Sequence, residues 1–136
     1  MATKIKSVSV VTARVLLGLI FFVFGLNFFL HFLPTPPPHG GAADAFAAGL
    51  FQSGYFFPML KGIEVVLGAL LLVGLFVPLS LVVLAPISIN ILLFHAFLSP
   101  ENTLMGIVIV VLHAYLAWAY RDYFKPLLER KTTVSL

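Results

Sequence analysis

The sequence predicts an all-α protein, an antiparallel up-down bundle of four transmembrane helices that forms a single integral membrane domain over residues 1–136. The chain has 136 residues, of which 61% are hydrophobic and 10% charged, whereas a soluble domain carries about 25% charged residues. Four apolar runs are each close to the roughly 20 residues that a helix needs to cross about 30 Å of hydrocarbon. These predicted spans are 8–33, 59–77, 79–98 and 103–120.

The first run, 8–33, follows Lys4 and Lys6, and a basic start before an apolar stretch is also typical of a secretory signal peptide. The run is about 26 residues long, however, well beyond the roughly 7–15 apolar residues of such a peptide. No small-residue cleavage pattern stands at its end, where Pro34 begins a proline-rich segment. We therefore expect it to be the first permanent span.

The segment 34–58 is the only long connection between spans. Prolines crowd its first residues, which makes that stretch stiff and extended. Residues 42–51 have helical spacing and moderate hydrophobicity. They fit a short interfacial helix or re-entrant lid, and they fit a plain ordered loop equally well.

Two short connections separate the last three runs. The one at Pro78 is so tight that the spans 59–77 and 79–98 must form an antiparallel hairpin. In the other, Ser99 precedes Pro100, which disfavours helix. Glu101 or Asn102 can then cap the helix that follows.

Most basic residues stand at the two ends of the chain, and the long connection has no Lys or Arg. Positively charged flanks stay on the cytoplasmic side of a membrane. Both termini are therefore predicted to be cytoplasmic and the long connection to lie outside. An even number of spans agrees with this, because it places both termini on the same side. The basic flanking residues are Lys4, Lys6, Arg14, Arg121, Lys125, Arg130 and Lys131.

The composition excludes several functions. With no cysteine, the chain has no disulfide, no thiolate nucleophile and no dithiol relay. Its basic residues form no stripe with interleaved aromatics, so nucleic acid is not an expected partner. The histidines and Glu64 could in principle hold zinc or copper, but no HxxxH pair is present. We predict no metal site and keep haem, held by two histidines, only as an alternative cofactor.

Polar side chains inside the predicted spans are the strongest functional signal. An ionisable group at such depth costs at least about 2.5 kcal/mol on insertion, so it usually faces the bundle interior or a wet cavity. Counted at about 1.5 Å per residue, all but Arg14 lie in the outer half of the membrane. We therefore expect a common pocket beneath the outer headgroups. The eight candidates are Arg14, Asn27, His31, Lys61, Glu64, Asn90, His95 and His113.

Two pairs of these candidates share a helix face. Asn27 and His31 are four residues apart, and Lys61 and Glu64 are three apart, close enough for an ion pair. Each also has a structural interpretation. Lys61 could snorkel to the interface, Glu64 could form a purely structural ion pair with it, and Asn27 could hydrogen-bond across helices.

The other four candidates are less simply arranged. Asn90 and His95 are five residues apart and diverge by about 140° on a regular helix, so both cannot point at the bundle axis. His113 lies near the midplane, where a structural hydrogen bond is the leading interpretation. Arg14 is expected to snorkel inward or to pair with a tail carboxylate such as Asp122.

The first span contains Arg14, Gly18, Gly25 and Asn27, and the second contains Gly62, Glu64, Gly68 and Gly74. This combination of glycine spacing and intramembrane charge resembles that of the DoxX family, small four-helix bacterial membrane proteins, over roughly residues 10–125. The resemblance implies the bacterial inner membrane and a link to quinone-coupled oxidation, as in thiosulfate–quinone oxidoreductase subunits, or to redox-stress complexes. Arg14 and Glu64 match the family's polar positions, whereas Asn27 and His31 stand where members often have a basic residue.

Three functions compete at this stage. The first is a quinone-binding subunit or accessory of a membrane redox system, with Glu64 and His31 moving protons and the other six candidates around the quinone. Its partners would be the lipid bilayer and a membrane redox protein or a second copy of the chain. The alternatives are a non-catalytic scaffold or assembly protein and a small proton-coupled solute transporter or channel.

Overall fold

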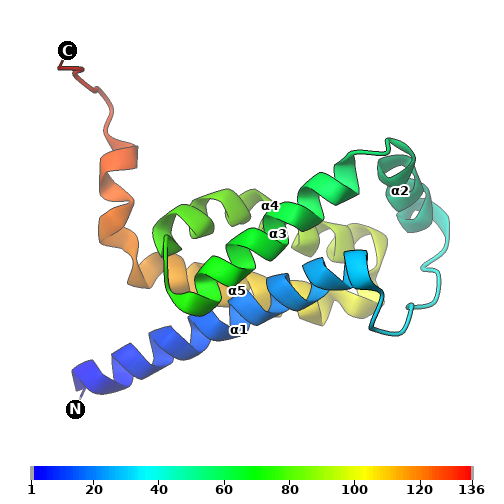
Figure 1. Cartoon of the computed structure of the whole chain (residues 1–136), viewed down its shortest axis with the longest axis horizontal. Helices are drawn as coiled ribbons and strands as arrows, with labels where there is room; N and C mark the ends of the chain where they lie inside the picture. Colours follow the sequence, from blue (N-terminus) through cyan, green and yellow to red (C-terminus); the bar gives the residue numbers. More distant parts are fainter. Residues whose placement is uncertain (1, 136) are drawn as a thin grey trace.

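The computed structural model describes the backbone of residues 2–135 and the side chains of residues 6–135, and all of the regular structure in that part is helical. Figure 1 shows the helices in chain order. The α-helices are α1 (Ala2–Leu30), α2 (Gly41–Gln52), α3 (Phe56–Val73), α4 (Val77–Leu98) and α5 (Thr103–Ala119), and the short 3-10 helices are η1 (Pro100–Asn102), η2 (Arg121–Tyr123) and η3 (Lys125–Leu128).

Four of these helices are long and apolar enough to cross a membrane, which confirms the predicted fold class and a multi-pass membrane protein. Within hydrocarbon a helix is favoured because it satisfies its own backbone groups. The four segments are Lys6–Leu30, Phe56–Val73, Val77–Leu98 and Pro100–Ala119. Both termini lie at one end of the bundle, here called the terminal end, and α2 lies at the other, the loop end (Figure 1).

Several helix ends differ from those expected. α1 stops at Leu30 rather than at residue 33, and α4 begins at Val77, so Pro78 lies inside its first turn. The tight turn expected at Pro78 is therefore formed by Gly74, Leu75 and Phe76. Of the two alternatives for residues 42–51, the helix is the one observed, as α2.

Asn27 ends α1. The N–H of His31 donates to the Asn27 carbonyl at 2.8 Å, and the N–H of Leu33 donates to the Asn27 side-chain oxygen, also at 2.8 Å. His31 itself takes a left-handed conformation with φ 52°, as residues that terminate helices often do. The side-chain amide of Asn27 therefore accepts from the Leu33 N–H, a backbone donor just after the end of the helix.

Gly74 ends α3 in the same left-handed manner, with φ 78° and its N–H donating to the Leu70 carbonyl at 2.9 Å. The Arg14 guanidinium lies directly against Gly74. A cation is favoured at this place because the last carbonyls of a helix carry partial negative charge. Asp122, expected as a partner of Arg14, instead accepts a hydrogen bond from Lys125 at 2.7 Å, and this bond lowers the pKa of the Asp122 carboxyl.

Glycines set how closely α1 and α3 approach. A Cβ added at Gly68 would lie 2.7 Å from the backbone nitrogen of Phe22 and 3.0 Å from the Gly18 oxygen. One added at Gly25 would lie 2.8 Å from a methyl carbon of Val65. Small residues permit such backbone contact between membrane helices, so α1 and α3 form the tightest pair in the bundle.

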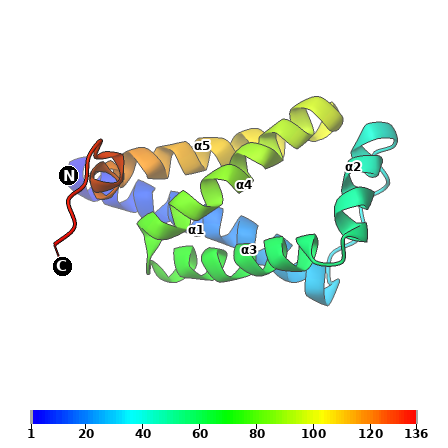
Figure 2. The same ribbon diagram turned by 90° about the horizontal axis from the view of Figure 1, so that it is seen from above.

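The hydrophobic core lies toward the terminal end, because its α3 and α4 members come from the helix halves beside the α3–α4 turn. From that turn α3 and α4 diverge, and α2 stands across the gap at the loop end (Figure 2). α3 and α4 are thus closest together at the terminal end and farthest apart at the loop end (Figure 2). The buried core residues are Ala13, Leu17, Phe21, Leu67, Leu71, Val77, Leu81, Leu84, Ile109 and Leu116.

Candidate functional site

A cavity of about 360 Å³ lies between the diverging halves of α3 and α4, beneath α2. We call it the lateral cavity, because its described lining comes from α2, α3 and α4 and none from α1 or α5. The lining residues are Phe46, Ala47, Leu50, Phe56, Phe57, Leu60, Lys61, Glu64, Pro86, Ile87, Asn90, Ile91, Phe94 and His95.

A second cavity of about 260 Å³, the interior cavity, lies between all four spans. Four residues line both cavities: Lys61, Glu64, Ile91 and His95. They form the wall between the two, and three of them are polar. The rest of the interior lining is apolar and consists of Ile20, Phe21, Phe24, Met105 and Ile109.

Lys61 and Glu64 form an ion pair at the centre of this wall. The Lys61 Nζ lies 3.1 Å from a Glu64 carboxylate oxygen, and Glu64 is only 3% exposed. Burying the Glu64 charge costs several kcal/mol, which its attraction to the partly exposed Lys61 must offset. The pair confirms the i,i+3 contact expected from the sequence. It presents a carboxylate acceptor and, on Lys61, further ammonium N–H groups to whatever occupies the cavities.

His95 stands opposite the ion pair on α4, with its ring orientation fixed by its own helix. Its Nδ1 lies 2.7 Å from the Ile91 carbonyl oxygen. A carbonyl can only accept, so Nδ1 carries the hydrogen, and in the neutral ring Nε2 is left as a hydrogen-bond acceptor. The Phe94 ring meets the imidazole edge to face, with centroids 5.5 Å apart. His95 can therefore receive a proton without rearranging.

Asn90 lines the lateral cavity from an exposed position on α4. The spacing of Asn90 and His95 predicts that they cannot both face the bundle axis. Both nevertheless line the lateral cavity, because it lies to the side of the axis, and only His95 also lines the interior cavity. The side-chain amide of Asn90 supplies both a donor and an acceptor.

The remaining four candidates lie elsewhere. Asn27 caps α1, Arg14 lies against Gly74 toward the terminal end, and His31 is exposed at the end of α1. None of these three lines either cavity. The common pocket expected from all four spans is thus formed by half of the predicted set, on α3 and α4.

His113, the fourth, has a structural role. Its Nε2 donates to the Leu81 carbonyl at 2.9 Å, which leaves Nδ1 to accept from the Ser88 hydroxyl at 2.8 Å. Both ring nitrogens are satisfied, and the ring ties α5 to α4. Leu81 lies in the turn of α4 that precedes Pro86, so this bond joins α5 to α4 just before the proline.

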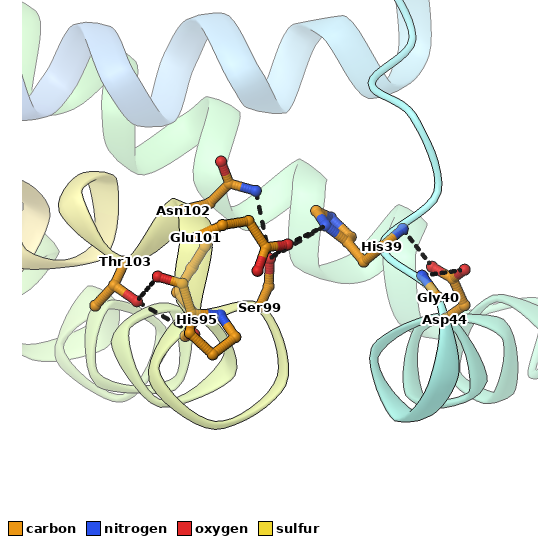
Figure 3. A network of polar contacts seen from close by, with 9 residues as sticks. His39, Gly40, Asp44, His95, Ser99, Glu101, Asn102 and Thr103 are labelled. Atoms are coloured by element: carbon orange, nitrogen blue, oxygen red, sulfur yellow. Dashed lines mark hydrogen bonds and ion pairs between the residues drawn. The ribbon is translucent and has the colours of Figure 1, made fainter.

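A polar cluster at the loop end had no place among the sequence-derived candidates. His39 Nδ1 lies 3.1 Å from the Ser99 hydroxyl and 3.8 Å from a Glu101 carboxylate oxygen (Figure 3). The backbone N–H groups of His39 and Gly40 donate to the Asp44 carboxylate at 3.1 and 2.8 Å. The sequence did contain one feature that could have pointed to His39 as a candidate: it lies between a stiff proline run and two glycines.

Within the described residues, no three His, Asp or Glu side chains come together in a way that could hold a metal ion. The polar wall has a carboxylate, an ammonium and one imidazole, and an ammonium beside the carboxylate already neutralises it. These groups suit hydrogen bonding and proton transfer to an organic ligand.

The fold and the site together define a small multi-pass helical membrane protein with a buried ion pair beside a lateral cavity. A family model described as DoxX matches residues 9–96, well over half of the chain. The protein therefore belongs to the DoxX family, as the resemblance indicated. The matched part contains the whole polar wall, and α5 lies beyond it. No curated protein sequence and no solved structure matches the chain.

Proposed function

We propose that this protein is a quinone-binding subunit or accessory of a membrane redox system in the bacterial inner membrane. The observation that carries the proposal is the lateral cavity itself: a mostly apolar slot lined by α2, α3 and α4, with Lys61, Glu64 and His95 among its lining residues. Since none of its described lining comes from α1 or α5, we infer that the slot opens sideways toward lipid. A quinone diffuses in the bilayer and has a polar head on an apolar tail. It needs this combination of a lipid-side entrance and a polar end wall.

The polar groups fit both redox forms of a quinone head. Lys61 and the Asn90 amide can donate hydrogen bonds to quinone carbonyls. Glu64 and the free Nε2 of His95 can accept from the hydroxyls of the reduced form. The cavity volume of about 360 Å³ lies within the usual range of roughly 300–1,000 Å³ for small-molecule sites. The aromatic side chains of Phe46, Phe56 and Phe94 line the slot and can pack on the ring.

The chemistry assigned to this chain is proton transfer and positioning. Reduction of a quinone consumes two electrons and two protons, and oxidation of the hydroquinone releases them. His95 and Glu64 are the proton-carrying groups at the cavity, and His95 takes the role that the sequence gave to His31. With the termini cytoplasmic, as the basic flanks predict, the exchange is on the outer side. A partner protein or a bound redox group would supply or accept the electrons.

A transporter finds less support. Below the polar wall the interior is filled by buried leucines from all four spans, among them Leu17, Leu71 and Leu116. His113, which would continue a path inward, has both ring nitrogens engaged. A scaffold would need neither a lipid-side cavity nor the costly burial of Glu64.

The test begins with the protein purified in mild detergent from quinone-containing cells. Solvent extraction and mass spectrometry should detect co-purified quinone, and a short-chain ubiquinone such as decylubiquinone should bind to protein depleted of it. The same preparation should show no Soret band, whose presence would favour haem.

A matched pair of variants locates the site. His95→Phe keeps a ring but removes the acceptor, and it should weaken decylubiquinone binding by about tenfold, the worth of one good hydrogen bond at a polar site. His31→Phe changes a histidine outside both cavities and should bind like the unaltered protein. Absence of both co-purified quinone and decylubiquinone binding would overturn the proposal.

A further inference from the structure

We propose that α2 is a hinged lid over the lateral cavity and that His39 is the latch that holds it closed. The inference rests on the proposed function only in making the cavity a ligand site. The mechanics of the lid stand on contacts of their own.

α2 forms the roof of the cavity. Phe46, Ala47 and Leu50 line it from above, and the Phe46 ring packs on Phe94 of α4 with centroids 5.9 Å apart. The attachment is otherwise slight, since Ala43 is the one buried residue of α2. The other side of the helix is open, and Phe51 there is 66% exposed.

Both ends of α2 have joints suited to rotation. Gly40 precedes it with φ 83°, Gly41 is its first residue with φ 54°, and Gly54 follows it with φ 80°. An added Cβ at any of the three would meet no heavy atom within 4 Å. Hinges are typically a few residues at element ends that absorb the backbone change. Little packing therefore resists a swing of α2.

His39 is what restrains it. The Ser99 hydroxyl donates to Glu101 at 3.0 Å, so His39 Nδ1–H donates to the Ser99 oxygen at 3.1 Å, with the Glu101 carboxylate 3.8 Å away (Figure 3). Ser99 is fully buried, so the latch receptor is fixed. The His39 ring also packs against Phe94, with centroids 6.1 Å apart.

Asp44 couples the latch to the lid. Its carboxylate, in the first turn of α2, accepts hydrogen bonds from the backbone N–H groups of His39 and Gly40. The latch residue and the first turn of the lid therefore move together. When the contact between His39 and Ser99 opens, α2 loses its only polar connection to the α4–α5 turn within the described residues.

The absence of cysteine allows a direct test. Ala47→Cys places one thiol on the cavity side of α2, and Ala48→Cys places one on its exposed side. The rate of modification by the anionic, water-soluble reagent 2-sulfonatoethyl methanethiosulfonate is measured for each in detergent micelles. A closed lid should make the first thiol much slower than the second.

The latch is then broken. His39→Ala removes one hydrogen bond and should raise the open population, and with it the modification rate at position 47, by about fivefold to tenfold. The rate at position 48 should not change. His31→Ala, at the far end of the same connection, should change neither rate. An unchanged rate at position 47 would overturn the proposal, and so would an equal acceleration at both positions, which would signal melting of α2.

Ligand release connects the lid to the site. His39→Ala protein should release decylubiquinone about fivefold to tenfold faster than the unaltered protein, because its lid opens more often. The modification assay uses no ligand. If decylubiquinone does not bind but His39→Ala accelerates modification at position 47 as stated, the quinone-binding proposal is overturned and the lid proposal stands. If decylubiquinone binds but His39→Ala does not change the modification rate at position 47, only the lid proposal is overturned.

Discussion

Gly68→Ala should destabilise the bundle by about 2–3 kcal/mol, because it adds a methyl group where α1 and α3 are in backbone contact. The new Cβ would lie 2.7 Å from the Phe22 nitrogen, 3.0 Å from the Gly18 oxygen and 3.1 Å from the Phe22 Cα. All three are rigid backbone atoms. Ordinary carbon contacts need roughly 3.5–4.0 Å, so the helices must separate by several tenths of an ångström along their whole contact.

The same helix supplies the control. Gly62 lies two turns from Gly68 on α3, and a Cβ added there would meet no heavy atom within 4 Å. Gly62→Ala should therefore be neutral, or stabilising by up to about 1 kcal/mol through helix propensity. The two substitutions are chemically identical, so their difference reports the close approach and nothing else.

The measurement is the free energy of unfolding in mixed micelles, followed by circular dichroism as sodium dodecyl sulfate is titrated. Thermal unfolding in a mild detergent provides an independent check. If Gly68→Ala were as stable as Gly62→Ala, the packing of α1 on α3 described above would be wrong, and with it the position of Glu64 beside the interior cavity.

Four further substitutions test individual features of the structure in the same unfolding assay. Lys61→Met should cost about 3 kcal/mol because it leaves the Glu64 carboxylate buried and unpaired. Glu64→Gln should cost less, since Lys61 is 24% exposed and can reach the surface, and equal costs would refute this asymmetry. His113→Phe should cost about 1–2 kcal/mol through two lost hydrogen bonds, and a neutral result would remove its structural role. Gly74→Ala should cost at least about 1–2 kcal/mol, because a side chain strains the left-handed backbone and the new Cβ would also displace the Arg14 guanidinium, and Gly62→Ala again provides the unstrained reference.

The sequence alone determined the number of spans, their antiparallel order and the placing of both termini at one end. It could do so because hydrocarbon leaves a chain of this composition few options: each apolar run must satisfy its backbone as a helix, and its length must match the bilayer. The contact between Lys61 and Glu64 was also predictable, because it is a local i,i+3 relation on a single helix. The capping role of Asn27 was not, although it is equally local, because a left-handed turn at His31 was not foreseen.

Only the tertiary structure decided which polar groups meet. The spans are apolar on nearly every side, so their patterning does not show which face of each helix turns inward. That rotation is set by packing across helices, such as the contact of Gly18 with Gly68, and the divergence of α3 from α4 makes the cavity lateral. The latch joins His39 to a residue 60 positions away, and His113 bonds to a backbone carbonyl of another helix. Such contacts depend on distances between helices, which local sequence patterns do not encode.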